Sequence, residues 1–280
     1  MSVIDRYAVF GHPIQHSKSP RIHRLFAEQT GQTLCYTAQE VLPENFHHAV
    51  STFFADGGKG LNCTVPLKEL AWQYAYQSTP RAALSKAVNT LILQDDGTTV
   101  LGDNTDGCGL LTDLTVNHQL VLAGQQVLIM GAGGASRGII AHLLAADVAS
   151  IIIVNRTIEK ALHLAHEFNQ SIPVKGLGFA DLAGYQFDLI INATSASLTN
   201  QLPPLSNHLL APQGICYDLA YSNEDTPFVR WGKQQLAQKS LDGLGMLVEQ
   251  AAEAFFLWRK VRPETQTVIA LLNAERTHTA

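Results

Sequence analysis

The sequence MGAGGASRG, residues 130–138, follows the apolar run VLIM and precedes a helical pattern of apolar residues. A strand, a glycine loop and a helix in this order form the phosphate-binding turn of a dinucleotide domain. The glycines let the backbone approach a pyrophosphate, and the helix N-terminus supplies free N–H groups. Ser136 stands in place of the third glycine, and its hydroxyl is a further candidate donor to phosphate. The residues expected to contact the cofactor here are Gly131, Ala132, Gly133, Gly134 and Ala135. The alternative is a tight turn that binds no ligand.

The next strand, IIIVN (151–155), ends without the acidic residue of an NAD site. An NAD-binding domain carries Asp or Glu about 20 residues after the glycines, where it holds the ribose hydroxyls. Asn155, Arg156 and Thr157 occupy that place, and the guanidinium of Arg156 offers a planar fork of donors to a 2′-phosphate. Lys160, one helical turn later, adds a second positive charge. The sequence therefore predicts NADP(H) rather than NAD(H), although a solvated Arg and Lys at a helix start would look the same.

Short apolar runs alternate with longer amphipathic segments along the whole chain, as they do in βαβ units. The runs that predict buried parallel strands are YAVFG (7–11), VLIMG (127–131), IIIVN (151–155) and DLIIN (188–192). The sequence therefore predicts an α/β protein of two domains, with the active site in the cleft between them.

The glycine loop lies at mid-chain, and such a loop follows the first strand of its domain. Everything before it must belong to a different domain. We expect a doubly wound, Rossmann-type domain over residues 106–242 and an open α/β substrate domain over residues 1–105. Residues 243–280 are expected to complete the substrate domain, because the segment 245–260 is apolar on most of its faces.

The composition favours a globular protein that acts on a small molecule. The chain has 280 residues, 46% hydrophobic and 15% charged, which is enough for two domains of ordinary size. A formal charge of −5 without runs of Lys or Arg gives no footprint for nucleic acid or an anionic membrane. Asp5 and Arg6 stand where a signal peptide would be apolar, and no apolar run is long enough to span a membrane. We expect a cytoplasmic monomer or homodimer.

The cysteines and histidines predict no metal site. The four cysteines are scattered without a CxxC pair, and the histidines lack an HExxH pattern or a flanking carboxylate cluster. We expect reduced thiols, ordinary loop and surface histidines, and no bound metal.

Two loops offer a lysine and an aspartate that can act together on a proton. In GLNCTVPLKEL (60–70), Thr64 is expected to cap a helix, which places Lys68 in the first turn, where a cation is unfavourable. In GDNTDGCGLL (102–111), Asp106 precedes a helix where the two domains should join. A lysine, an aspartate and a hydride carrier are sufficient for reversible alcohol oxidation. The alternatives are an inert, exposed lysine and an aspartate that only caps its helix.

The loop after the first strand, GHPIQHSKSPRIH (11–23), offers a site for a small carboxylate. Ser17 and Ser19 lie just ahead of Pro20, a residue that starts helices. Two hydroxyls and free N–H groups at a helix start suit an anion. The alternative is that Ser19 simply caps the helix.

Together these segments resemble the shikimate dehydrogenase family over nearly the whole chain. The matching motifs, in family order, are GHPIQHSKSPRIH (11–23), GLNCTVPLKE (60–69), AVNT (87–90), GDNTDGCGL (102–110), GAGGASR (131–137), NRT (155–157), INATS (191–195) and DGLGMLVEQAAEAF (242–255). One glycine loop is weak support, but eight motifs in order are specific. The resemblance implies reduction of 3-dehydroshikimate to shikimate with NADPH, on the route to chorismate and the aromatic amino acids.

The resemblance also implies roles for single residues. Ser17 and Ser19 would bind the substrate carboxylate, with Tyr221 assisting from across the cleft. Lys68 and Asp106 would be the catalytic pair. The other residues expected around the ring hydroxyls are Thr64, Asn89 and Gln250. The residues expected beside the nicotinamide are Thr194, Leu219 and Gly243.

Three positions depart from the family pattern. Arg24 replaces a usual Asn, and Ala196 and Ser197 occupy a loop that normally includes a glycine. If that glycine lets the backbone approach the nicotinamide, Ser197 is expected to shift the loop and weaken cofactor binding.

Two other functions stay open on the sequence alone. One is a quinate/shikimate dehydrogenase of broader substrate or cofactor use, against whose use of NAD the NRT segment and Lys160 argue. The other is a non-catalytic NADP- or metabolite-binding sensor on the same fold, against which the intact Lys68 and Asp106 argue.

Overall fold

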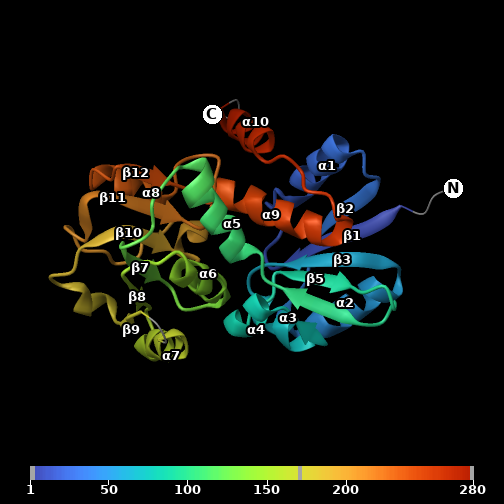
Figure 1. Ribbon diagram of the computed structural model, residues 1–280, viewed down its shortest axis with the longest axis horizontal. Coiled ribbons are helices and arrows are strands. Elements are labelled where there is room, and N and C mark those ends of the chain that lie inside the picture. Colours follow the sequence, from blue (N-terminus) through green and yellow to red (C-terminus); the bar gives the residue numbers. More distant parts are fainter. Residues whose placement is uncertain (1–3, 170–171, 278–280) are drawn as a thin grey trace.

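The computed structural model describes residues 4–169 and 172–277, which form two α/β domains (Figure 1). Each domain is built on a six-stranded sheet. The fold class predicted from the sequence is confirmed, and the predicted apolar runs all lie in strands that have parallel neighbours.

The first sheet is mixed, in the order β2-β1-β3-β5-β6-β4. Strand β1 is parallel to β2 and β3, whereas β5 is antiparallel to both β3 and β6. The strands are β1 (Asp5–Gly11), β2 (Leu34–Glu40), β3 (Gly58–Cys63), β4 (Gln77–Ser78), β5 (Thr90–Leu93) and β6 (Val100–Asp103).

Helices cover both faces of this sheet. On one face, Phe10 and Leu61 of the sheet pack against Val50 and the helices α2 (Phe46–Ala55), α3 (Lys68–Tyr74) and α4 (Pro80–Ser85). The helices α1 (Ser19–Thr30), α9 (Leu244–Arg259) and α10 (Gln266–Thr277) share a second cluster that includes Phe26 and Phe255. The last two helices of the chain therefore pack with the first one.

The second sheet is parallel throughout, in the order β12-β11-β10-β7-β8-β9. Counted within the domain, this is the strand order of the doubly wound dinucleotide-binding fold. The strands are β7 (Gln126–Met130), β8 (Ser150–Val154), β9 (Val174–Leu177), β10 (Phe187–Asn192), β11 (Leu210–Asp218) and β12 (Lys239–Leu241). Strand order reverses between β7 and β10, so a ligand crevice is expected at their carboxyl ends.

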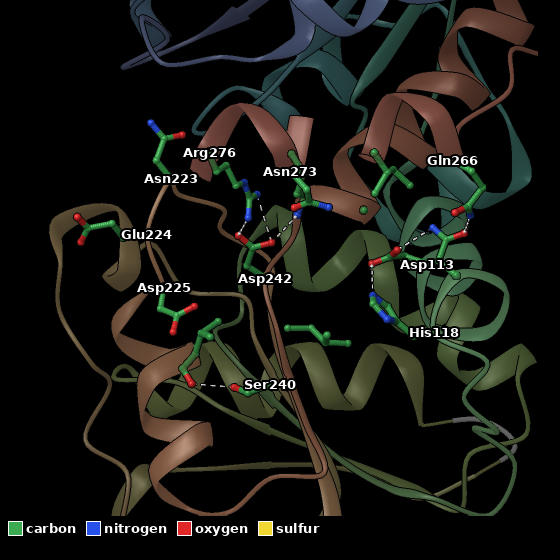
Figure 2. Close-up of a pocket in the computed structure, with 16 residues that line it drawn as sticks. Asp113, His118, Asn223, Glu224, Asp225, Ser240, Asp242, Gln266, Asn273 and Arg276 are labelled. Atoms are coloured by element: carbon green, nitrogen blue, oxygen red, sulfur yellow. Dashed lines mark hydrogen bonds and ion pairs between the residues drawn. The ribbon is translucent and has the colours of Figure 1, made fainter. Parts of the chain in front are cut away.

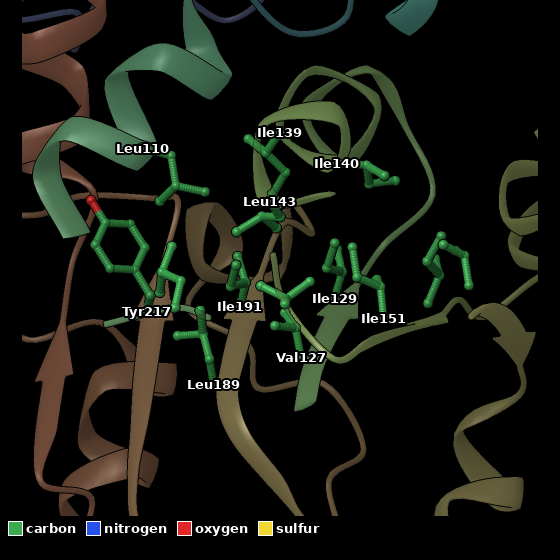
Figure 3. Close-up of a cluster of buried hydrophobic side chains, with 14 of the residues drawn as sticks. Leu110, Val127, Ile129, Ile139, Ile140, Leu143, Ile151, Leu189, Ile191 and Tyr217 are labelled. Atoms are coloured by element: carbon green, nitrogen blue, oxygen red, sulfur yellow. The ribbon is translucent and has the colours of Figure 1, made fainter. Parts of the chain in front are cut away.

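The strands of the second sheet are apolar because both faces are covered. On one face, Ile129 and Ile191 pack against Ile139, Leu143 and the helices α6 (Gly134–Ala145) and α7 (Ile158–Phe168) (Figure 3). Helix α8 (Pro227–Gln234) packs on the other face through Phe228. Because helices pack on both faces, the sheet is held in place, and with it the positions of the loops at the carboxyl ends of its strands.

Helices α5 (Asp106–Thr112) and α9 lie side by side between the two sheets (Figure 1). Helix α5 continues into a π-helical segment, Asp113–Asn117, where the carboxylate of Asp113 accepts a 2.6 Å hydrogen bond from the Tyr217 hydroxyl. At the far end of α9, the indole of Trp258 donates to the carbonyl of Leu91 in the first sheet. The pair of helices therefore connects the two domains.

His23 contradicts the expectation of loop and surface histidines, because it is buried in α1 in an aromatic environment. Its ring stacks on Tyr36 with a centroid distance of 4.1 Å, and neither ring nitrogen has a hydrogen-bond partner among the described residues. Burial lowers the pKa of His23 to about 3 from its ordinary value of 6.5. His23 therefore binds a proton near pH 6.5 in the unfolded chain but stays neutral at that pH in the folded chain.

We expect the free energy of unfolding to fall as the pH drops below 6.5 toward 3, by about 1.4 kcal/mol per pH unit for this one group. His23→Phe should remove that part of the slope, as urea titrations at several pH values would show. The exposed His48→Gln is the matched control. An unchanged slope in His23→Phe would contradict the burial of a neutral imidazole.

Candidate active site

Lys68 and Asp106 form an ion pair at the junction of the two domains. The Lys68 Nζ donates to Asp106 Oδ2 at 2.5 Å, and only 13% and 6% of the two side chains are exposed. Lys68 is the first residue of α3 and Asp106 the first residue of α5. The structure thus brings together the two residues that the sequence singled out. Among the described residues, the lysine side chain is mostly buried, and the aspartate side chain makes no capping hydrogen bond to α5.

The predicted cap of α3 was wrong. The helix begins after Leu67, and no side chain caps it. Thr64 lies instead in a preceding turn, where its carbonyl accepts from the Leu67 N–H at 2.8 Å. The hydroxyl of Thr64 is therefore not used as a cap, and its methyl lies over Gly11 at the end of β1.

Asn89 connects the ion pair to α9. Its Nδ2 lies 2.9 Å from Asp106 Oδ1 and 3.1 Å from Gln250 Oε1. Its Oδ1 accepts from the backbone N–H of Thr105 at 2.8 Å, which fixes the amide orientation. The carboxylate of Asp106 is therefore held from two sides, by a cation and by a neutral amide.

Sequence reasoning missed two members of this network. Asn62, which is buried, donates to the carbonyl of Asn89 at 3.0 Å and accepts from the Tyr36 hydroxyl at 2.6 Å. The buried hydroxyl of Thr105 lies 2.8 Å from Asn89 Nδ2. Both residues stand inside the quoted motifs, beside Thr64 and Asp106, so their position was a signal that went unused.

Ser17, Ser19 and Tyr221 meet where α1 begins. The Ser17 hydroxyl accepts from the Ser19 N–H at 3.3 Å, and the Tyr221 hydroxyl accepts from the Lys18 N–H at 3.5 Å. The alternative that Ser19 caps the helix was wrong, because the cap position belongs to Lys18 and Ser19 is the first helical residue. Tyr221 reaches this loop from the segment that follows β11.

The glycine loop lies directly against the ion pair. A Cβ added at Gly134 would lie 3.4 Å from Lys68 Cβ, and one added at Gly138 would lie 3.2 Å from Asp106 Oδ2. Gly131 has φ +105°, a conformation that favours glycine, and its Cα faces Ala193. No atom of the described residues lies within 4 Å of the place a Cβ would take on Gly133, so the backbone there is open to a ligand.

Ser136 does not face a phosphate. Its side chain is fully buried and its hydroxyl donates to the carbonyl of Gly131 at 2.8 Å. The expectation of a hydroxyl donor to the ligand was therefore wrong: the serine ties the start of α6 back to the end of β7.

Ser136→Ala is expected to lower the free energy of unfolding by about 1 kcal/mol, the usual net value of one hydrogen bond. Because the hydroxyl faces the protein, the affinity for NADPH should change less than twofold. Urea unfolding and a fluorescence titration with NADPH measure the two quantities. A tenfold loss of affinity for NADPH without loss of stability would show instead that the Ser136 hydroxyl contacts a phosphate.

The segment expected to discriminate the cofactor lies at the end of β8. Asn155 Nδ2 donates to the carbonyl of Thr157 at 2.9 Å, which shapes the turn into α7. Arg156 and Lys160 are exposed, and within residues 4–169 and 172–277 no ion pair occupies either side chain. Two cations next to the glycine loop are thus available to an anionic ligand.

Thr194, Leu219 and Gly243 approach one another at the carboxyl end of the second sheet. The Leu219 N–H donates to the carbonyl of Asn192, and a Cβ at Gly243 would collide with the Leu219 carbonyl at 2.3 Å. Ala193, which precedes Thr194, faces Gly131 of the glycine loop. Of the departures from the family pattern, Arg24 lies on an exposed face of α1, and Ser197 donates to Asp218 at 2.6 Å.

An ion triad that the sequence did not reveal joins the domains beside the glycine loop. Glu167 of α7 accepts from Lys86 at 2.8 Å and from Arg137, in the glycine-loop motif, at 2.5 Å. Burial alone would raise the pKa of Glu167, but the hydrogen bonds from Lys86 and Arg137 lower it to about 2. The triad links the residue after α4 to two helices of the second domain.

A separate pocket of about 420 Å³ lies between β12, α8 and α10, where the ion pair of Asp242 and Arg276 crosses its wall (Figure 2). Neither Lys68 nor Asp106 lines it, so it is distinct from the site described above. In the part of the chain that the structure describes, no cluster of His, Cys, Asp or Glu could hold a metal ion. Within the same residues, no helix is both long and apolar enough to cross a membrane.

The fold and the site define a class of enzyme. A glycine loop on a doubly wound domain lies against a buried lysine–aspartate pair contributed at the junction with a second domain. This is the arrangement of a dinucleotide-dependent dehydrogenase that acts on an alcohol.

Comparison with known proteins gives the particular family. Family models match three parts of the chain: the shikimate dehydrogenase substrate-binding domain over residues 9–91, shikimate/quinate 5-dehydrogenase over 114–201, and the shikimate 5′-dehydrogenase C-terminal domain over 243–272. The shikimate dehydrogenase (NADP(+)) of Methylococcus capsulatus is 60% identical over 276 residues, 99% of each chain. The chain belongs to the shikimate dehydrogenase family, as the motifs predicted.

Solved structures agree in fold. A crystal structure of an Ael1 enzyme from Pseudomonas putida has a TM-score of 0.86 and 44% identity, covering 96% of this chain and 98% of the other. The shikimate 5-dehydrogenase of Thermus thermophilus, solved in complex with NADP(H) and shikimate, has a TM-score of 0.85 and 31% identity over 98% and 100% of the two chains.

Proposed function

We propose that this protein catalyses the reversible, NADPH-dependent reduction of 3-dehydroshikimate to shikimate, on the route to chorismate and the aromatic amino acids. The observation that carries the proposal is the buried pair of Lys68 and Asp106, 2.5 Å apart and beside Gly134 and Gly138 of the glycine motif. Family membership supplies the substrate.

Lys68 and Asp106 are proposed as the catalytic pair. NADPH, when bound, supplies the hydride that reduces the carbonyl carbon of the substrate. In the reduction, the pair donates a proton to the carbonyl oxygen. In the oxidation direction, the pair accepts the proton of the substrate hydroxyl. One of the two residues transfers the proton, and the other sets the charge and orientation of that residue. Asn89 keeps the Asp106 carboxylate directed toward Lys68.

The substrate-binding residues are proposed from their places around this pair. Asn89 donates to Asp106, Gln250 accepts from Asn89, and Thr64 lies in the turn before Lys68. Ser17 and Ser19 lie beside the start of α1, with Tyr221 approaching from the second domain, and are proposed to bind the carboxylate.

The residues at the end of β7 fit an NADP pyrophosphate, since Gly131 is left-handed and Gly133 is open. The flanking loop residues proposed to contact it are Ala132, Gly134 and Ala135. Arg156 and Lys160, with Asn155 and Thr157 in the same turn, are proposed to hold the 2′-phosphate. The residues proposed beside the nicotinamide are Thr194, Leu219 and Gly243.

The division of the chain is part of the proposal. Residues 1–105 with 243–280 are proposed as the substrate domain and 106–242 as the NADP domain, in support of which the first sheet ends at Asp103 and the second at Leu241. We further propose that the protein works in the cytoplasm, as a monomer or homodimer, and binds no nucleic acid.

We expect the purified protein to oxidise NADPH when 3-dehydroshikimate is added, and to reduce NADP⁺ with shikimate. The fall in NADPH absorbance measures the first reaction. Quinate and NAD⁺ serve as the comparison substrate and cofactor. Equal rates with quinate or NAD⁺ would favour a quinate/shikimate dehydrogenase, and NADPH binding without turnover would favour a non-catalytic sensor.

A further inference from the structure

Asp218, the last residue of β11, is a buried carboxylate that the proposed reaction does not use. It has no exposed surface. Its Oδ2 accepts 2.6 Å hydrogen bonds from the hydroxyls of Ser197 and Thr226, and its Oδ1 accepts from Asn192 Nδ2 and the Ala220 N–H, both at 3.1 Å. Among the described residues no cation lies within ion-pair distance of it.

Such a carboxylate is costly to bury, and it persists only because four donors satisfy it. Burial raises the pKa of Asp218, and the hydroxyls of Ser197 and Thr226 act against that rise. The donors come from the end of β10, from the segment after β10, from the segment after β11, and from the residue that caps α8. One side chain therefore fastens four segments at the carboxyl edge of the second sheet.

Asp218 reaches Thr194 through a single residue. Asn192 donates to Asp218 with its Nδ2, and its Oδ1 accepts from the Thr194 hydroxyl at 2.7 Å and from the Thr194 N–H at 3.2 Å. Because both ends of the Asn192 amide are used, its orientation is fixed. The loop that carries Thr194 is therefore oriented by the carboxylate.

Asp218 also positions the other two residues proposed to lie beside the nicotinamide. Leu219 is its chain neighbour and is tied to the Asn192 carbonyl, and the Gly243 N–H donates to the Ala220 carbonyl at 3.0 Å. The three residues proposed to lie beside the nicotinamide, Thr194, Leu219 and Gly243, thus share one anchor.

We propose that Asp218 and its donors Ser197 and Asn192 form a positioning unit that holds the nicotinamide half of NADPH in place for hydride transfer. The inference rests on the proposed function. The family pattern led us to expect that Ser197 weakens cofactor binding. The proposal instead assigns Ser197 to positioning the cofactor, since its hydroxyl both donates to Asp218 and accepts from Asn192 Nδ2 at 3.1 Å. Asp218 is a positioning residue, because its side chain is fully buried and acts through Asn192 and Ser197.

The test separates the two halves of the cofactor. Asp218→Asn keeps the size of the side chain but places an NH₂ group opposite donors in either orientation. We expect the Kd for NADPH to rise tenfold or more, about the effect of losing a hydrogen bond to a charged group. The Kd for 2′,5′-ADP, which lacks the nicotinamide, should stay within twofold.

Turnover gives a second readout. In Asp218→Asn we expect kcat to fall by about 10²-fold, because a displacement of about 1 Å at the reacting centre has that effect. The KM for 3-dehydroshikimate should stay within twofold. The primary deuterium isotope effect on kcat with 4-deuterated NADPH should increase, since hydride transfer becomes slower relative to product release.

Ser197→Ala removes one donor only and keeps the test valid if Asp218→Asn does not fold. It should shift the same quantities in the same direction by a smaller factor. Thr199→Ala is the matched control, because Thr199 is exposed in the same loop and donates only to the Ala196 carbonyl, at 3.0 Å. It should behave as wild type.

The proposal is overturned if the folded variants bind NADPH as wild type does, or if NADPH and 2′,5′-ADP weaken equally. The two binding measurements need no substrate. A wild-type protein that does not turn over 3-dehydroshikimate would therefore count against the proposed function and leave the positioning proposal to be decided by binding.

Discussion

Replacing Lys68 by alanine is expected to lower kcat by about 10²–10⁴-fold, the range that a positioned proton-transfer group contributes. The ammonium lies 2.5 Å from Asp106, with 13% of the side chain exposed, so water cannot readily replace it in the same geometry. The KM for 3-dehydroshikimate and the Kd for NADPH should change much less. Steady-state rates and an NADPH titration measure these quantities.

The variant needs two controls, because removal of Lys68 leaves a buried carboxylate without its cation. Lys68→Met fills the same space, and its thermal unfolding shows whether the fold is kept. Lys233→Ala removes an exposed lysine that is also paired with an aspartate, Asp225, and should leave kcat unchanged. Near-normal turnover of Lys68→Ala with intact binding would disprove the proposed catalytic pair.

Asp106→Asn extends the same argument. If the two side chains act as one unit, each single change and the double change should lower kcat by similar factors rather than multiply. Independent roles would instead give a double variant whose loss is the product of the two single losses.

Replacing Arg156 by glutamine is expected to raise the KM for NADPH more than tenfold, since a charge-assisted hydrogen bond contributes about 1.5–3 kcal/mol. The KM for NADH should stay nearly constant, because NADH has no 2′-phosphate for the guanidinium to meet. The ratio of kcat/KM for the two cofactors is the measurement. Arg156 is exposed, so the change should not disturb the fold.

Arg24→Gln is a suitable control, because Arg24 is another exposed arginine and lies in the middle of α1 of the other domain. It should leave the cofactor ratio unchanged. An equal loss of kcat/KM with NADPH and NADH in Arg156→Gln would contradict the contact between Arg156 and the 2′-phosphate. No loss with either cofactor would indicate that Lys160 makes this contact instead.

Local patterns in the sequence were sufficient for the fold class and for the family. The run VLIMG predicted a strand at 127–131, and β7 spans Gln126–Met130. Four residues of that strand are buried because both of its faces are covered. A strand of this kind appears in the sequence as a continuous apolar run. The sheet order, the antiparallel strand β5 and the start of α3 were less accessible, because pairing partners and turns depend on distant segments.

Sequence alone therefore determined that this is an α/β protein with a dinucleotide loop and an arginine where an acid would select NAD. It also singled out the lysine and the aspartate that we propose for proton transfer. Only the tertiary structure decided which of them meet. Lys68 and Asp106 are 38 residues apart and touch because α3 and α5 begin at the same junction. The same holds for Ser136, whose hydroxyl turned inward, and for Asp218, whose four donors come from separate segments. A residue's type and neighbours in the chain are local, whereas burial and hydrogen-bond partners arise only when the folded chain brings distant segments together.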